Sequence, residues 1–147
     1  MHPTTVGVDL AKNIFELALA DAHWRMCGRR RLTRRQFERF LAAQPPGHLV
    51  MEACATAHHW GRFAQPHGHR VTLLPAHDVR PYVHRNKTDR THAEALLEAV
   101  RSGGIRPVPV KTAAQQEVLA IHRVRDRWIA LRTPPSTRFG ASCGNTA

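Results

Sequence analysis

Three acidic side chains stand at positions where a chain of this composition could hold a divalent cation. Asp9 ends an alternating apolar stretch, Glu52 ends a short apolar run, and Asp89 lies at the start of a helix-like segment. Carboxylate oxygens are the ligands that Mg²⁺, and also Mn²⁺, prefers. Two such ions activate a water or hydroxyl and stabilise the leaving oxygen when a phosphodiester is cleaved. Asp9, Glu52 and Asp89 are therefore candidate catalytic and metal-binding residues.

Each of these acids also has an ordinary explanation. Asp9 could be a solvated turn residue and Glu52 a surface residue at a strand end. Asp89 is favoured near a helix start by the helix dipole alone. The three together, each at an element terminus in a basic chain, favour a metal-dependent nuclease-like site.

Hydropathy periodicity and helix-capping signals predict the elements that would position these acids. Residues 4–21 alternate on both sides of a turn at 11–13, which is typical of two paired strands. Thr33 is a candidate helix N-cap. Further along, we expect a strand over 23–32, a helix from 33 to 43, a strand over 48–52, a helix over 57–66, a strand over 70–75, a basic loop over 80–90, a helix over 88–101 and a long helix over 113–132.

This order predicts an α/β fold, with a mixed sheet flanked by helices. It is also the order of the ribonuclease H-like fold, in which the first and fourth strands are neighbours, so that Asp9 and Glu52 would converge. Two carboxylates ~4 Å apart repel by about 4 kcal/mol at an effective dielectric near 20. A divalent cation removes that repulsion.

Composition points to the partner. The 147 residues carry 22 Lys+Arg against 11 Asp+Glu, a net charge of +11, which favours a nucleic acid. A GC-rich genome that inflates arginine is the alternative explanation. We expect neither a membrane span nor a signal peptide, and three cysteines without paired spacing fit a reduced cytoplasm.

We expect a catalytic domain over 1–110, the start of a helical linker over 111–133 and a disordered tail over 134–147. The last helix carries an apolar stripe for which the chain offers little partner, so a homo-oligomer is expected. Its members are Val118, Ile121, Val124 and Trp128 or Ile129.

Several blocks together resemble the DEDD transposases of bacterial insertion sequences, which have a RuvC/ribonuclease H-like amino-terminal domain. The resemblance covers about 6–133. It is carried by VGVDLAK at 6–12, MEAC at 51–54 with HHW at 58–60, NKTDR at 86–90, and QQ at 115–116 with HRVR at 122–125.

The resemblance implies DNA strand cleavage and exchange for transposition, by three acids and a fourth aspartate that bind metal, guided by a structured bridge RNA. The fourth acid would stand at His92, whose imidazole suits Zn, Mn or Fe better than Mg²⁺. We hypothesise a frameshift after Thr133. If it holds, we expect the family's carboxyl-terminal serine domain to be missing.

Basic residues bracket the acids and are candidates for binding nucleic-acid phosphates: Lys12, Arg85, Lys87 and Arg90. Two alternatives to a recombinase stay open: an inactive, truncated remnant that still binds nucleic acid, and an actin- or sugar-kinase-like ATPase. A Holliday-junction resolvase belongs with the recombinases. The pairs His58-His59 and His67-x-His69 favour solvated or capping histidines over zinc ligands, and we expect Trp24, Trp60 and Trp128 to anchor the core.

Overall fold

The computed structural model describes residues 4–83 and 89–132, with side chains at all of these except 89–91. The chain divides into two compact units, Met1–Thr112 and Ala113–Ala147. The predicted loop residues 84–88 and the predicted tail over 134–147 lie outside the described residues. The first unit contains the sheet and is described first.

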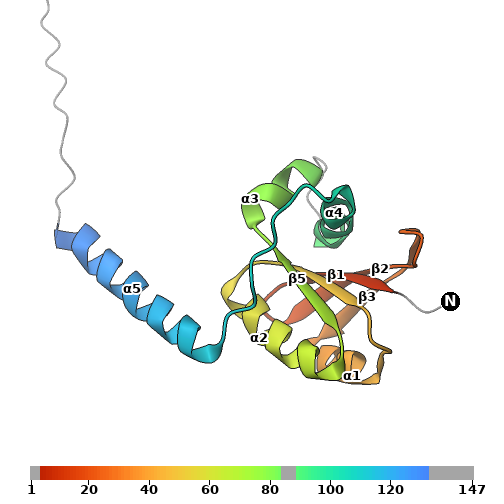
Figure 1. The fold of residues 1–147 in the computed structure, drawn as a ribbon, viewed down its shortest axis with the longest axis horizontal. Coiled ribbons are helices and arrows are strands. Elements are labelled where there is room, and N and C mark those ends of the chain that lie inside the picture. Colours follow the sequence, from red (N-terminus) through yellow and green to blue (C-terminus); the bar gives the residue numbers. More distant parts are fainter. Residues whose placement is uncertain (1–3, 84–88, 133–147) are drawn as a thin grey trace, which may run out of the picture. The chain divides into compact units, whose positions relative to one another are not determined.

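Five strands form one mixed sheet in the order β3-β2-β1-β4-β5 (Figure 1). β1 pairs antiparallel with β2 and parallel with β4, while β2 pairs antiparallel with β3 and β4 pairs parallel with β5. The first and fourth strands are therefore neighbours, as the element order predicts. The strands are β1 (Thr5–Leu10), β2 (Ile14–Ala20), β3 (Met26–Thr33), β4 (His48–Glu52) and β5 (Arg70–Leu74).

The third strand begins later than its sequence indicates. The prediction placed its start at His23, whereas β3 begins at Met26. The carboxylate of Asp21 accepts the backbone N–H groups of His23 and Arg25 at 2.8 and 2.9 Å, which holds these residues in a turn. The hydrogen bond from Arg25, above all, lowers the pKa of Asp21 below its usual value. Trp24 completes this turn at φ 60 and is not a core residue, contrary to the prediction.

The helix α1 (Arg34–Ala43) begins where the capping signal predicts. The Thr33 hydroxyl accepts the Gln36 backbone N–H, and the Gln36 side chain accepts the Thr33 N–H at 2.8 Å, so two amide donors of the helix start are satisfied reciprocally. Phe37 is fully buried and packs edge-on against Phe15 and Trp60, at ring-centroid distances of 5.2 and 5.0 Å. This aromatic group is the centre of the larger core cluster.

The next segments differ from the prediction in detail. The helix α2 (Ala55–Ala64) begins two residues before the predicted start, and the one-turn helix η1 (Gln65–His67) follows it. Two further short helices were not predicted, α3 (Ala76–Val79) and η2 (Arg80–Tyr82), so the predicted basic loop is helical at its beginning. Val108 forms an isolated antiparallel bridge with Leu73, which adds a short contact beside β5.

Helices cover both faces of the sheet (Figure 1). The helices α1 and α2 lie on one face, and α3 and α4 (Asp89–Ser102) lie on the other. Gly7 in β1 permits the close approach of α4, since a Cβ atom there would lie 2.4 Å from the carbonyl oxygen of Ala93. The buried side chains of α4 are those of alanine and leucine residues.

The second unit is described by α5 (Ala113–Arg132), with the bounds that the sequence predicts. All of its predicted stripe is exposed, from Ile129 at 49% to Ile121 and Trp128 at 69%. Trp128 therefore contradicts the expectation of a core anchor, whereas Trp60, at 3% exposure, confirms it. Of the helices in the described ranges, none is long and apolar enough to cross a membrane.

The α/β class and the mixed sheet are as predicted, and the strand order with its flanking helices agrees with the ribonuclease H-like fold.

Candidate functional site

Asp9 and Glu52 occupy equivalent positions on neighbouring parallel strands. The paired register of β1 and β4 ends with Val8 opposite Met51, and the two acids are the next residue on each strand. The carboxyl ends of parallel strands meet at the same edge of a sheet, and both residues are partly exposed there. The first two predicted acids are therefore placed at one edge of the sheet.

Both acids also project to one face. Side chains alternate along a strand, so Asp9 shares a face with Gly7, and Glu52 shares a face with Val50. Gly7 faces Ala93 and Leu97 of α4, and Val50 packs in the cluster that includes buried residues of the same helix. Asp9 and Glu52 therefore lie on the face of the sheet that α4 covers.

The third predicted acid begins α4. Asp89 lies four residues, or about 6 Å along a helix axis, before Ala93, whose carbonyl lies against Gly7. The side chains of Asp89 and Arg90 are not described, and Arg85 and Lys87 lie outside the described residues. His92 is half-buried on α4, one residue before Ala93.

Among the described side chains, no group of three or more His, Cys, Asp or Glu could together hold a metal ion. Asp9 and Glu52 provide two carboxylates. The third predicted ligand is Asp89, whose side chain is not described. The convergence of Asp9, Glu52 and Asp89, with or without His92, therefore stays a prediction.

Besides the three predicted acids, a further carboxylate and an arginine lie directly across the strands from Asp9. The sequence did not single them out. Glu16 of β2 is directly opposite Asp9, and Arg31 of β3 is directly opposite Glu16. The Arg31 Nε lies 3.1 Å from Glu16 Oε1, and 16% of the Glu16 side chain is exposed. The alternation of Glu16 with buried Phe15 and Leu17 could have assigned its face, but only the strand register assigns its neighbours.

Lys12 lies in the exposed turn between β1 and β2, three residues after Asp9. Its backbone carbonyl accepts a hydrogen bond of 3.0 Å from Arg34 Nε, which ties this turn to the first residue of α1. Arg34, which was not among the predicted site residues, therefore lies close to the turn that follows Asp9.

One histidine of each pair serves the packing of the unit. His58 is buried, and its Nδ1 accepts the Lys111 N–H at 3.1 Å. Burial, followed by the charges of Lys111 and Arg62, lowers the pKa of His58. His69 is buried between the Gly47 N–H and the Leu41 carbonyl. In each pair one histidine, His58 or His69, is buried and hydrogen-bonded to backbone groups, whereas His59 and His67 are exposed, as expected of solvated histidines.

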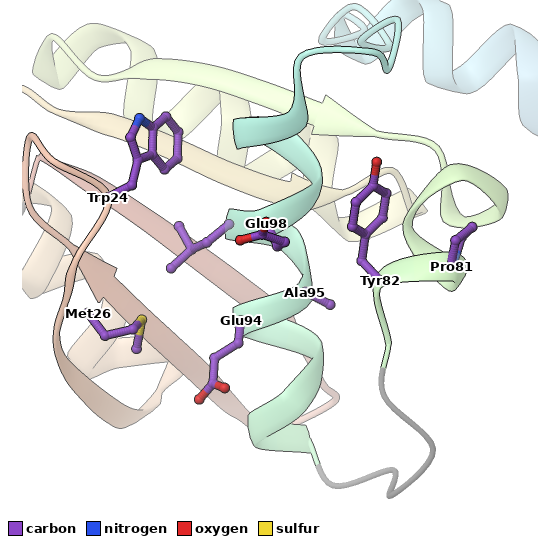
Figure 2. A pocket seen from close by; sticks show the side chains of 8 residues that line it. Trp24, Met26, Pro81, Tyr82, Glu94, Ala95 and Glu98 are labelled. Atoms are coloured by element: carbon purple, nitrogen blue, oxygen red, sulfur yellow. The ribbon is translucent and has the colours of Figure 1, made fainter.

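A cavity of about 500 Å³ lies beside α4, between the turn that precedes β3 and the segment around Tyr82 (Figure 2). Glu94 and Glu98 extend from α4 toward the side where Trp24 and Met26 lie. Both carboxylates are already ion-paired, Glu94 with Arg29 and Glu98 with Arg101. Asp9 and Glu52 do not line this cavity.

Comparison with known proteins gives a consistent result. The sequence model of the IS110-type DEDD family, described as "Transposase", matches residues 6–141. The chain is 42% identical over 133 residues to a "Probable family 20 transposase" of Pseudomonas aeruginosa, covering 90% of this chain and 39% of that protein. It is 38% identical over 138 residues to the transposase for insertion sequence element IS1328 of Yersinia enterocolitica, covering 94% of this chain and 41% of that protein.

A third relative, the transposase for insertion sequence element IS1111A of Coxiella burnetii, is 39% identical over 128 residues, with 87% of this chain and 35% of that protein covered. The chain thus spans about two fifths or less of the length of these relatives. No solved structure matches the chain.

Proposed function

Since the chain belongs to the IS110-type DEDD transposase family, we propose that its sheet-containing unit supplies the DNA-cleaving part of transposition. The observation that carries this proposal is the placement of Asp9 and Glu52 at the ends of adjacent parallel strands, on one face of the sheet. Rigid strand ends hold side chains in place while leaving their heads accessible, which suits a reacting phosphodiester. Family membership disfavours the ATPase alternative.

The proposed cofactor is Mg²⁺ or Mn²⁺, held by Asp9, Glu52 and Asp89. The donor set fits, because carboxylate oxygens are hard ligands and because neighbouring carboxylates repel each other until a cation binds. When bound, the metal activates a water or hydroxyl and stabilises the leaving oxygen. His92 in place of a fourth carboxylate favours Mn²⁺ over Mg²⁺.

The proposed partner is DNA, bound through phosphates by Lys12, Arg85, Lys87 and Arg90. Lys12 is described and lies in the exposed turn next to Asp9, which supports its share of this role. A guide RNA and a homo-oligomer complete the proposal. The exposed apolar stripe of α5 is compatible with a multimer.

A cleavage assay tests the proposal. Branched and single-stranded DNA are incubated with the 147-residue chain and Mg²⁺ or Mn²⁺, and nicked product is quantified. We expect metal-dependent nicking that Asp9→Asn and Glu52→Gln each reduce to background, because either substitution removes a metal-binding charge. Glu98→Gln is the matched control, as it removes an exposed carboxylate of α4 that pairs with Arg101. We expect His92→Asp to raise the rate with Mg²⁺ relative to Mn²⁺.

Two outcomes contradict this proposal. Binding of DNA without nicking in either metal would favour the alternative, a remnant that only binds nucleic acid. Nicking that survives both Asp9→Asn and Glu52→Gln would place the chemistry elsewhere in the chain.

A further inference from the structure

The positive charge of the chain is concentrated in one segment, which runs through the strand β3 into the helix α1. Residues 25–39 contain seven arginines and one acid, Glu38, whereas the whole chain has 22 Lys+Arg and 11 Asp+Glu. About a tenth of the chain therefore carries more than half of the net charge of +11. These arginines, all exposed, are Arg25, Arg29, Arg30, Arg31, Arg34, Arg35 and Arg39.

This segment, residues 25–39, is here called the basic edge; it consists of the end of the turn before β3, the strand β3 and α1 as far as Arg39. Among the described strands β3 lies at the edge of the sheet, because it pairs with β2 and ends the order β3-β2-β1-β4-β5. Arginines along an edge strand also discourage pairing with a further strand. That protective role needs no particular side-chain orientation. A fixed orientation of the arginines would therefore indicate a second role, such as binding a ligand.

Two arginines of the basic edge are held on the face that carries Asp9 and Glu52. Arg29 forms an ion pair with Glu94 of α4, and Arg31 forms one with Glu16 of β2. Their side chains nevertheless remain 58% and 68% exposed. A guanidinium has five N–H donors in a rigid fork, so a carboxylate on one side leaves donors for a phosphate on another. The ion pairs thus pre-orient the two groups and reduce the entropy lost on binding.

The register connects these arginines to the candidate site. Arg31, Glu16 and Asp9 are directly opposite one another on three adjacent strands. Strands are about 4.8 Å apart, so Arg31 lies about 10 Å from Asp9 across the sheet. Arg29 is two residues from Arg31 on the same face, or about 7 Å along the strand. A phosphate at Arg31 would therefore be close to a phosphodiester at Asp9.

We infer that the basic edge binds the sugar–phosphate backbone of the DNA strand that reaches Asp9 and Glu52, with Arg29 and Arg31 contacting phosphates. This inference rests on the proposed function, because the shared face with the two acids selects DNA as the ligand. A protein partner is disfavoured, since the fully buried core of a protein interface is mainly apolar. On the basic edge, Met26 is the exposed large apolar residue among those described.

A binding experiment in EDTA separates this inference from the cleavage chemistry. The dissociation constant of a fluorescently labelled DNA duplex is measured over a salt series for the 147-residue chain and for Arg29→Gln/Arg31→Gln. Each lost phosphate contact lowers the log–log salt slope by about 0.9, so the double variant should lose nearly two. At ~0.1 M salt this corresponds to a roughly ten- to hundredfold weaker affinity.

The matched control is Arg70→Gln/Arg106→Gln, which removes two exposed arginines without touching the basic edge. Arg70 begins β5 at the other edge of the sheet, and Arg106 lies two residues before the bridge of Val108 to β5. We expect this control to retain most of the log–log salt slope of the unmodified chain. Arg29→Lys/Arg31→Lys should keep the slope but bind more weakly, because lysine retains the charge and loses the fork. Thermal melts establish that every variant is folded.

Each outcome decides the inference. An equal loss in the Arg70/Arg106 control would attribute binding to net charge and overturn it. If Arg29→Gln/Arg31→Gln weakened the binding of single-stranded RNA but not the binding of DNA, the assignment to DNA would be overturned. If the unmodified chain binds DNA and is insensitive to Arg29 and Arg31, the inference fails while the proposed cleavage stands. If the unmodified chain binds no DNA at low salt, both fail.

Discussion

At the scale of single residues, function and stability are assigned to different titratable groups. Asp9 and Glu52 are partly exposed at strand ends, where a ligand can reach them. His48 and His58, by contrast, are used in packing, and burial is the main cause that lowers the pKa of each. The His48 Nε2 lies 2.8 Å from the Thr72 hydroxyl, and His58 accepts the Lys111 N–H. The folded state therefore favours the neutral form of both imidazoles.

His58 gives the unit a pH-dependent stability. Its pKa is lower in the folded state than the value of about 6.5 in the unfolded chain. Its contribution is therefore fully present above about pH 6.5 and is lost as the pH falls through the folded-state value. We expect the free energy of unfolding to decline as the pH falls below about 6.5. It should decline less in His58→Asn, because an asparagine oxygen can replace Nδ1 as acceptor without titrating. Urea unfolding at several pH values measures this.

His59→Asn is the control for that measurement, because His59 is the exposed neighbour on the same helix. An identical pH dependence in the unmodified chain and in His58→Asn would contradict the assignment.

At the scale of elements, the contact between β1 and α4 positions the candidate site. The helix begins at Asp89, and its approach to the sheet is set by the absence of a side chain at Gly7. On the other face, the aromatic group of Phe15, Phe37 and Trp60 holds α1 and α2. The Thr33–Gln36 capping box fixes where the basic edge passes from strand to helix.

Gly7→Ala tests the contact between β1 and α4. The added Cβ would lie 2.4 Å from a backbone oxygen, which cannot move without shifting the helix. We expect a loss of about 1–3 kcal/mol in the free energy of unfolding, as for other overpacked sites. A reduced nicking rate should accompany it, since the start of α4 moves relative to Asp9. Denaturant unfolding and the cleavage assay measure the two effects.

Gly28→Ala is the matched control, a glycine in β3 whose added Cβ would be 3.8 Å from Leu19 Cδ1, an ordinary contact. We expect a change within about 0.5 kcal/mol. Equal losses for the two substitutions would mean that strand glycines matter for backbone freedom and not for the approach of α4.

At the scale of the whole molecule, the two compact units differ in how they bury apolar surface. The unit Met1–Thr112 encloses a core on both faces of its sheet. The described part of the second unit is α5, in which no residue is buried. The chain also spans 39% of the Pseudomonas relative and 41% of the Yersinia relative. A single exposed helix contributes little to the stability of a separate core.

A chain that ends at Thr112 should therefore fold. We expect its free energy of unfolding to differ from that of the 147-residue chain by less than about 1 kcal/mol, or roughly 4–8 °C in melting temperature. A chain that ends at Arg106 should be less stable, because it lacks the Val108 N–H bond to the Leu73 carbonyl at 2.8 Å and the Lys111 bond to His58. Thermal melts by circular dichroism compare the three chains. An unfolded 112-residue chain would show that the first unit depends on residues beyond it.

The amino-acid sequence alone was sufficient for the fold class, for most element bounds and for the placement of Asp9 and Glu52 at strand ends. Alternation in 4–21, the Thr33 capping box and the apolar run that ends in Glu52 are local signals, so they can be read without knowing what lies across the sheet. It failed at Trp24 and Trp128, because burial of a tryptophan depends on distant partners and not on its neighbours in sequence. The row of Arg31, Glu16 and Asp9 came from strand register, since a slip of one residue would turn each side chain to the opposite face. The close approach of α4 to Gly7 likewise joins residues more than eighty positions apart, and only packing of the folded chain brings them together.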